Sequence, residues 1–199
     1  MRIRRSLLAA VAALVLAGAC TVPTTEEPVE LSGSIVPETT TTTSTTIASA
    51  SNRDVVVYLL ATIDGTTTLR PVPRSVELGS GVQGVLANLF SQRPSNDRDA
   101  EVGLSTAIPE GASLLSADVD PDDPDRLVVD VRGLFGSEGG VQGAQLRDAL
   151  AQIVWTATEG ESGINEVVFR QDGQPRPALV DNLESTTDAV RRRDYSREN

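Results

Sequence analysis

The most regular alternation of apolar and polar residues lies in residues 141–159 (VQGAQLRDALAQIVWTATE). Apolar residues recur there at steps of three and four, which places them on one face of an α-helix. The apolar positions are Leu146, Ala149, Leu150, Ile153, Val154 and Ala157, and the polar positions on the other side are Gln145, Arg147, Asp148, Gln152 and Thr156. We therefore predict an amphipathic helix whose apolar face packs against a sheet.

Short runs rich in β-branched residues surround this helix and predict the strands of that sheet. They are residues 55–61 (VVVYLLA), 67–76 (TTLRPVPRSV), 114–119 (LLSADV), 126–132 (RLVVDVR), 164–170 (INEVVFR) and a short final run at 176–180 (RPALV). Pro71 and Pro73 cannot donate ladder hydrogen bonds, so the second run is expected at a sheet edge. A second helix is predicted over residues 80–91, with Ser80 and Gln83 spaced for a capping box.

The order of these elements predicts an α+β fold. Two hairpins are each followed by a helix, and the full order is ββαββαβ(β). We expect a two-layer sandwich in which two helices cover one face of a mostly antiparallel sheet of about five or six strands. This domain is predicted to occupy residues 54–180, and a polar C-terminal tail is predicted at residues 181–199.

The N-terminal residues 1–19 have the layout of a bacterial signal peptide. Three arginines precede the apolar run LLAAVAALVL at residues 7–16, which is shorter than the ~20 residues needed to cross a bilayer. Small residues then precede Cys20, the only cysteine of the chain, in the sequence LAGAC. This segment resembles a lipoprotein lipobox, with Ala17 where the family usually has Leu. The resemblance implies cleavage before Cys20, acylation of that residue by fatty acids such as palmitate, and anchoring to the extracytoplasmic side of the cell membrane.

Two other interpretations of the N-terminus stay open. Cys20 is then either a small buried residue of an uncleaved leader, or part of a secretory signal that is cleaved elsewhere. Residues 20–53 are rich in Thr, Ser, Pro and Glu and show no periodic apolar pattern, so we predict a lipidated, disordered linker. A spacer is the role that this composition favours over a glycosylated stalk or a docking segment.

The composition narrows the chemistry that the chain can perform. Its net charge is −11, and removal of residues 1–19, which hold three arginines and no acid, would make it −14. Such a surface disfavours nucleic acid and anionic membrane surfaces as partners. The chain has no His, no Lys and a single Cys, which excludes Ser-His-Asp and Cys-His nucleophiles, His or Cys zinc clusters, Lys Schiff bases and internal disulfides. Carboxylate-based catalysis stays available, and no cofactor is predicted.

The order of motifs over residues 55–174 resembles the GerMN domain, a module of sporulation and spore germination proteins that is also common in bacterial surface lipoproteins. The resemblance is carried by VVVYLL (55–60), LRPVPRSV (69–76), GVQGVLANLF (81–90), GLSTAIPEGASLLSADVD (103–120), RLVVDV (126–131), QLRDALAQIVWTATE (145–159) and INEVVFRQDGQ (164–174). The sequence RRRDY at residues 191–195 is similar to the family's ending. The resemblance implies a role in envelope assemblies through protein contact, and it brings no catalytic residues.

Acidic residues offer the remaining candidate sites, and one group is the run Asp118, Asp120, Asp122, Asp123 and Asp125. Hard cations such as calcium take several carboxylate oxygens. The EF-hand spacing fails, however, because its sixth position would be Asp123 instead of Gly and its twelfth Val129 instead of Glu. A hairpin turn made of Asp and Pro explains the same residues, and we predict that turn.

Glycoside hydrolysis needs two carboxyl groups about 5 to 10 Å apart, usually beside aromatic platforms. The acids available for it are Asp118, Asp120, Asp130, Glu159 and Glu166. Trp155 is the only tryptophan, and its place in the predicted helix indicates packing or a partial surface role. We therefore expect these acids to be solvated surface residues and predict no catalytic residue.

Two further patterns have ordinary explanations. One is the set of glycines Gly133, Gly136, Gly139, Gly140 and Gly143. Their spacing does not match a dinucleotide fingerprint, and a parallel strand–helix unit is not expected there, so we predict a flexible approach to the helix. The basic run at residues 191–193 suits an acidic partner or lipid headgroups, but a solvated tail is the interpretation that we favour.

We expect a non-enzymatic, membrane-anchored lipoprotein whose GerMN-like domain binds other envelope proteins and holds no metal. The alternative is a module that binds or hydrolyses cell-wall glycan such as peptidoglycan, and a purely structural spacer is a third interpretation. A cleft with converging carboxylates and exposed aromatic residues would favour glycan. An exposed sheet edge or apolar patch would favour protein contact.

Mass spectrometry of the mature N-terminal peptide tests the lipid anchor. We expect a peptide that begins at Cys20 and carries the added mass of fatty acyl groups, because the lipobox-like sequence directs both cleavage and acylation. A mature peptide that begins elsewhere, or one without acyl groups, would contradict this prediction.

Overall fold

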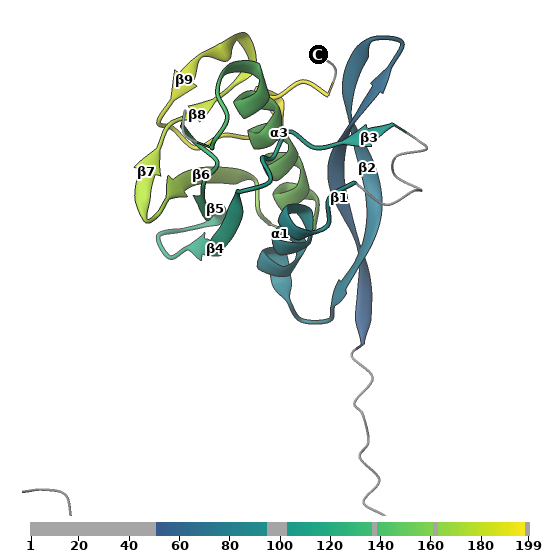
Figure 1. The fold of residues 1–199 in the computed structure, drawn as a ribbon. Helices are drawn as coiled ribbons and strands as arrows, with labels where there is room; N and C mark the ends of the chain where they lie inside the picture. Colours follow the sequence, from purple (N-terminus) through teal and green to yellow (C-terminus); the bar gives the residue numbers. More distant parts are fainter. Residues whose placement is uncertain (1–50, 95–102, 137–138, 161–162, 198–199) are drawn as a thin grey trace, which may run out of the picture. The chain divides into compact units, whose positions relative to one another are not determined.

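Sheets on both sides enclose the helices of this protein. The computed structural model describes residues 51–94, 103–136, 139–160 and 163–197. In chain order the elements are β1 (Asn52–Ile63), β2 (Thr66–Glu77), α1 (Gly81–Ser91), β3 (Leu104–Ser105), β4 (Ser113–Asp120), β5 (Asp123–Arg132), α3 (Gly143–Gly160), β6 (Glu166–Gln171), β7 (Gln174–Arg176), β8 (Ala178–Leu179), the 3-10 turn η1 (Asp181–Leu183), β9 (Ser185–Thr186) and the 3-10 turn η2 (Arg192–Asp194). Helices α1 and α3 lie between the β1–β2 hairpin and the sheet that contains β4, β5 and β6 (Figure 1).

The first sheet has the strand order β2-β1-β3. β1 and β2 pair over their whole length, from Asn52 opposite Glu77 to Ile63 opposite Thr66. The two-residue strand β3 pairs with the end of β1 on its other side. β2 therefore lies at an edge, as Pro71 and Pro73 predicted, because an edge strand needs hydrogen bonds on one side only.

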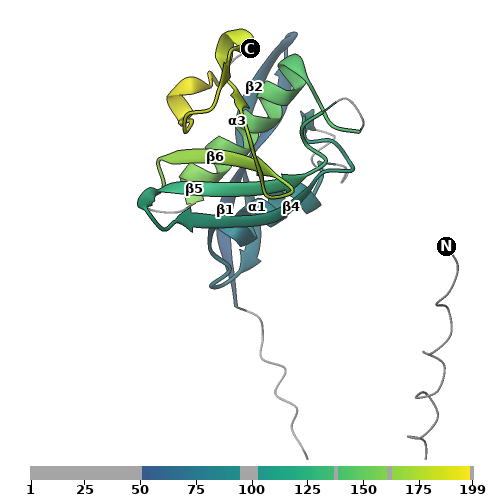
Figure 2. The ribbon, with the colours of Figure 1, turned by 90° about the vertical axis from the view of Figure 1, so that its left-hand side faces the viewer.

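The second sheet has the order β4-β5-β6-β7, and Figure 2 shows β4, β5 and β6 side by side. β4 and β5 form an antiparallel hairpin, whereas β5 and β6 run parallel with Val129 opposite Phe169. α3 is the crossover helix of this parallel pair. The predicted α+β class, its two helices and the order of its main elements are confirmed. The structure adds that the strands are divided between separate sheets, which lets α3 be covered from two sides.

The parallel pair corrects one expectation about the glycine-rich segment before α3. A parallel strand–helix–strand unit is present, although the spacing of the glycines still does not match a dinucleotide fingerprint. Gly140 has a packing role instead, because a Cβ atom there would come within 2.9 Å of the Leu134 carbonyl oxygen. The backbone of Val141 donates a hydrogen bond to the same oxygen at 2.9 Å.

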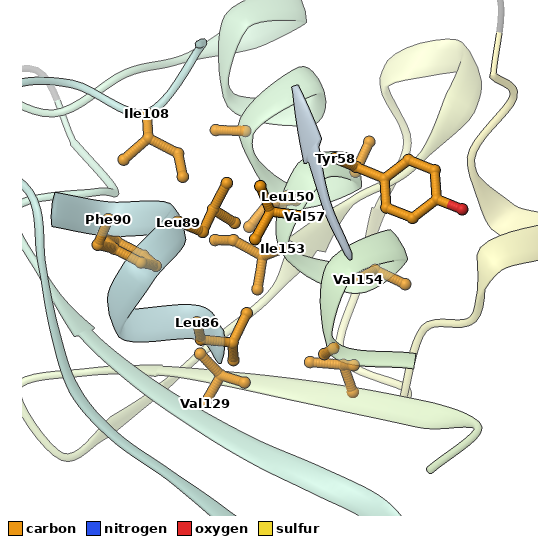
Figure 3. Packing of buried hydrophobic residues seen from close by; sticks show 14 of the residues in the cluster. Val57, Tyr58, Leu86, Leu89, Phe90, Ile108, Val129, Leu150, Ile153 and Val154 are labelled. Atoms are coloured by element: carbon orange, nitrogen blue, oxygen red, sulfur yellow. The ribbon is translucent and has the colours of Figure 1, made fainter. Parts of the chain in front are cut away.

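The core lies where the hairpin, the helices and the second sheet meet. In Figure 3, Val57 of β1, Leu86 and Leu89 of α1 and Ile153 of α3 point toward one another, and Val129 of β5 closes the cluster. Burial of each such aliphatic side chain contributes roughly 1.5 to 3 kcal/mol to folding. The apolar face predicted for α1 is confirmed, and its buried residues include Val82, Val85, Leu86, Leu89 and Phe90.

The start of α1 differs from the prediction. The Ser80 side chain makes no capping hydrogen bond to the helix. Its hydroxyl donates to the Glu77 carbonyl oxygen at 2.7 Å instead, so the predicted capping box with Gln83 is wrong. Ser80 thus stabilises the turn between β2 and α1.

α3 is the predicted helix, but it is buried on more than its apolar face. Gln152 and Thr156 are 0 % exposed and Arg147 is 7 % exposed, although the pattern predicts all three on the polar side. The amphipathic interpretation is wrong at these positions because the β1–β2 hairpin covers Gln152 and Thr156, and the C-terminal segment covers Arg147. Polar groups in such a place need hydrogen-bond partners.

Gln152 and Thr156 of α3 find such partners on the backbone of β1. Thr156 Oγ1 accepts a hydrogen bond from the Tyr58 N–H at 2.9 Å, and Gln152 Nε2 donates to the Tyr58 carbonyl oxygen at 3.0 Å. Gln152 Oε1 also accepts from the Ala107 N–H at 2.8 Å. Tyr58 lies opposite Pro71, which has no N–H to donate. The N–H and C=O groups of Tyr58 therefore point away from β2 and toward α3. Side chains of α3 thus take the place of a neighbouring strand.

The C-terminal residues 181–197 pack onto the same framework. Val190 and Val167 exchange two backbone hydrogen bonds of 2.9 Å, and the Leu69 N–H donates to the Arg197 carbonyl oxygen at 2.8 Å. Val190 and Tyr195 are each 1 % exposed. The interpretation of the basic run in this segment as part of a solvated tail is therefore wrong, because the segment fills part of the core.

An ion-pair cluster fixes this segment to α3. Arg147 donates to Asp181 Oδ1 at 2.8 Å from Nε and 2.6 Å from Nη2, and to Asp148 Oδ1 at 2.6 Å. The Ser196 N–H donates to Asp181 Oδ2 at 2.8 Å, and its hydroxyl binds the same oxygen. Burial acts to raise the pKa of Asp181, but the hydrogen bonds from Ser196 and Arg147 prevail and lower it. Burial raises the pKa of Asp148, which Arg147 offsets only in part.

Replacement of Gln152 tests the link between α3 and β1. Gln152→Leu leaves the Tyr58 carbonyl and the Ala107 N–H without their partner inside the core, so we expect the free energy of unfolding to fall by about 3 kcal/mol. Urea denaturation measures this change. The control Gln83→Leu makes the same substitution at an exposed position of α1 and should change stability by less than about 0.5 kcal/mol. Equal effects of the two substitutions would contradict the prediction.

Replacement of Asp181 tests the ion-pair cluster and its pH dependence. We expect Asp181→Asn to lower the free energy of unfolding by about 1 to 2 kcal/mol at pH 7. Because the folded protein lowers the pKa of Asp181, this difference should persist above about pH 4 and shrink as the pH falls through the folded pKa. Asp148 is present in both proteins, so its titration largely cancels. Asp188→Asn, at an exposed position of the same segment, is the control, and a difference that does not depend on pH would refute the linkage.

Candidate functional site

The predicted lipid-attachment residue, Cys20, and the predicted signal peptide lie outside the described residues. The acylation of Cys20 therefore stays a prediction. None of the helices in the described segments has the length and apolar content needed to span a bilayer.

The acidic run of the sequence forms the turn between β4 and β5. Asp120 pairs with Asp123 across it, Asp120 Oδ1 accepts from the Asp122 N–H at 3.0 Å, and Asp123 Oδ1 accepts from the Asp125 N–H at 3.2 Å. Arg126 lies 3.6 Å from Asp120 Oδ2 and 3.0 Å from Asp123 Oδ2. The predicted hairpin turn is confirmed. Within the described part of the chain, no group of three or more His, Cys, Asp or Glu residues is arranged to hold a metal ion.

Of the acids considered for glycan hydrolysis, Asp120 and Glu166 are brought together by Arg126, which lies 3.6 and 3.3 Å from their carboxylate oxygens. Glu159 forms an ion pair with Arg192 at 2.6 Å, and Glu166 forms one with Arg126 at 3.3 Å. Asp130 accepts the Gly173 N–H at 2.9 Å on another part of the sheet. Two surface hollows near the C-terminal segment, with volumes of about 600 and 660 Å³, contain Glu166 and none of the other four acids. Arginines thus engage three of the five acids, Asp120, Glu159 and Glu166.

Trp155 is covered by the C-terminal segment. The guanidinium carbons of Arg197 and Arg192 lie 4.8 and 5.0 Å from its ring centroid, and the Tyr58 ring lies 5.3 Å away. Such cation–π contacts stabilise a fold by about 0.5 to 2 kcal/mol each. Burial and the nearby Glu159 raise the pKa of Tyr58 more than the arginines lower it. The sole tryptophan thus holds the chain terminus and offers no open platform to a sugar ring.

Arg191 and Arg193 line both hollows, Arg192 lines the one of about 600 Å³, and each is paired with an acid. Arg191 binds Glu166, and Arg192 donates to Thr158 Oγ1 at 2.6 Å as well as to Glu159. Arg193 has the most exposed side chain of the three, at 72 %. The run therefore acts mainly as an internal clamp. The sequence could not predict that these arginines contact α3 and β6, because their partners are 25 or more positions away in the chain.

The outer edge of β4 is the longer of the two edges of the second sheet, because β7 at the other end has only three residues. β4 stands at the end of the strand order, and no strand in the described residues pairs with its outer side. Leu115 and Val119 on this strand are 37 % and 49 % exposed. A groove of about 340 Å³ runs between β4 and the start of α1, and its lining includes Val82, Ala117, Val119, Pro124 and Ile164. The sequence predicted the strand, but its edge position depends on which other strands pair.

The comparisons with known proteins agree with this fold. The profile of the Germane family, described as sporulation and spore germination, matches residues 37–177. The structure of the tandem GerMN domains of the sporulation protein GerM from Bacillus subtilis is similar, with a TM-score of 0.51 and 17 % identity, and the match covers 72 % of this chain and 46 % of that one. This chain thus spans about half the length of the tandem structure.

A second solved structure, the first GerMN domain of the same Bacillus subtilis protein, matches with a TM-score of 0.46 and 15 % identity over 71 % of this chain and 98 % of that one. No curated protein sequence matches the chain significantly. At these identities the structural likeness concerns the fold. Because the family profile covers more than half of the chain, this protein belongs to the Germane family of sporulation and spore germination proteins, and it contains a GerMN-type domain.

Proposed function

We propose that this protein is a non-enzymatic lipoprotein, anchored through Cys20 on the extracytoplasmic side of the cell membrane, whose GerMN-type domain binds another protein of the cell envelope. The open edge of β4, with Leu115 and Val119 exposed beside an apolar groove, is the observation that carries this proposal. Exposed strand edges and apolar patches are features of protein-binding surfaces.

The arrangement of polar residues supports protein contact over glycan chemistry. Asp120, Glu159 and Glu166 are paired with arginine, and Trp155 is covered by arginine side chains. Arg126 holds the carboxylates of Asp120 and Glu166, and Trp155 offers no uncovered aromatic platform to a sugar ring. The strongest polar contacts of the domain instead hold its own segments together.

The predicted linker would give the domain a limited reach. About 30 residues of flexible coil separate its ends by roughly 30 Å on average. A domain held at that distance meets the periphery of neighbouring membrane proteins rather than distant layers of the wall. A tether of this length supports a partner that lies close to the membrane.

Photo-crosslinking in cells tests the proposal. The chain has no Lys, so amine-reactive reagents are unsuitable, and a photo-reactive amino acid is placed instead at Leu115 on β4, Ile63 on the first hairpin and Leu183 on the C-terminal segment. We expect a discrete adduct with one envelope protein from at least one position. The adduct should disappear in Cys20→Ala, because loss of the anchor removes the protein from the membrane. Adducts with glycan alone, or co-sedimentation with isolated peptidoglycan, would support the glycan alternative and refute the proposal.

A further inference from the structure

We infer that the outer edge of β4 binds an extended segment of the partner as an added β-strand, and that this segment alternates aliphatic with basic residues. The inference rests on the proposed function and identifies its contact surface. An edge strand presents unpaired N–H and C=O groups along one side, and an added strand satisfies them while pockets for alternate side chains give specificity.

Of the two long edge strands in the described residues, β4 is the one open to such pairing. The other long edge strand, β2, carries Pro71 and Pro73, which remove two N–H donors and block an added strand. β4 has the sequence SLLSADVD, without proline, lysine or arginine. Its ladder with β5 is irregular near Leu114 and again near Val119, and it runs regularly through Ala117 and Asp118. The regular stretch is where a partner strand would pair.

The face of this stretch that is turned toward the core favours aliphatic residues in the partner. Ala117 lies opposite Val129 and Val119 opposite Leu127, and both β5 residues are fully buried in the core. Val119 itself is half exposed because it lines the groove of about 340 Å³ beside Val82. Side chains of an added strand that project to this side would enter the groove. An aliphatic residue there would bury Val119 and part of the groove wall.

The opposite face of the stretch, which is turned toward solvent, favours basic residues in the partner. Asp118 lies opposite Val128 on that side and is exposed, and within the described residues no cation pairs with it. Asp120 is already engaged by Arg126. Opposite charges on adjacent strands stabilise pairing by about 0.2 to 1 kcal/mol, and like charges oppose it. A basic residue of the partner next to Asp118 is the complementary arrangement.

The charge of the whole chain argues for a basic partner over a second copy. The net charge is −11 and the chain has no Lys, so each of two copies joined at β4 would bring Asp118 and an acidic turn to the contact and no lysine to offset them. Carboxylates that meet at such a contact repel one another at physiological ionic strength. A basic segment gains from the same field.

Capped peptides test the inference with the full mature protein in detergent micelles. The probe is an eight-residue peptide that alternates Arg and Val, and the matched control is a peptide with the same composition in two blocks of four. We expect the alternating peptide to bind at least tenfold more tightly in fluorescence anisotropy titrations. Amide hydrogen exchange in residues 113–120 should slow when it binds.

Variants locate the binding to the edge. Val119→Lys places a charge in the groove and should weaken binding of the alternating peptide at least tenfold, whereas Ile63→Lys, at an exposed position of β1, should leave it unchanged. Asp118→Asn should weaken binding severalfold and reduce its salt dependence. Thermal unfolding confirms that each variant is folded, and Asp118→Asn, at an exposed site, keeps the test valid if Val119→Lys is destabilised.

Equal binding of the two peptides, or binding that Val119→Lys and Asp118→Asn leave unchanged, would overturn the inference. Sedimentation that shows a dimer of the wild type and a monomer of Val119→Lys would assign the edge to a second copy instead and would also overturn it. The proposed function is tested separately. An envelope-protein adduct from Ile63 or Leu183 with none from Leu115 would support that function and refute the edge as its surface.

Discussion

The hydrogen bonds between the side chains of Gln152 and Thr156 and the backbone of Tyr58 hold the two halves of this structure together. They join α3 to β1, and the residues that they connect are more than 90 positions apart in the chain. Because both side chains are completely buried, loss of either partner leaves polar groups without hydrogen bonds in a region of low polarity. The hairpin can therefore cover α3 only in one register, and the core forms around that fit.

The C-terminal segment closes the structure by a different kind of contact. Arg192 and Arg197 lie over Trp155, and Arg147 binds Asp181 at the start of the segment. Aromatic and charged groups of the kind that form ligand sites in other proteins here bind the C-terminal segment to α3. This explains why the acids and the tryptophan of α3 do not form an open cleft.

In the part of the chain that the structure describes, the outer edge of β4 has no partner strand. Pairing of strands is directional and needs few special side chains, so a protein without His or Lys can still recognise a partner in this way. The two sheet edges differ because proline protects β2, whereas β4 has aliphatic and acidic side chains on alternate sides. In the proposed function, this edge is the surface that binds another protein near the membrane.

Local patterns in the sequence determined the secondary structure, the α+β class and the edge position of β2, because residue spacing and proline act within a few positions. The composition also determined which reactions are closed to the chain. The tertiary structure alone decided the burial of Gln152 and Thr156, the pairing of Arg191 with Glu166 and the exposure of β4. Each of these depends on segments that meet from distant parts of the chain, and the polarity of a side chain does not reveal whether a distant backbone group will satisfy it in the core.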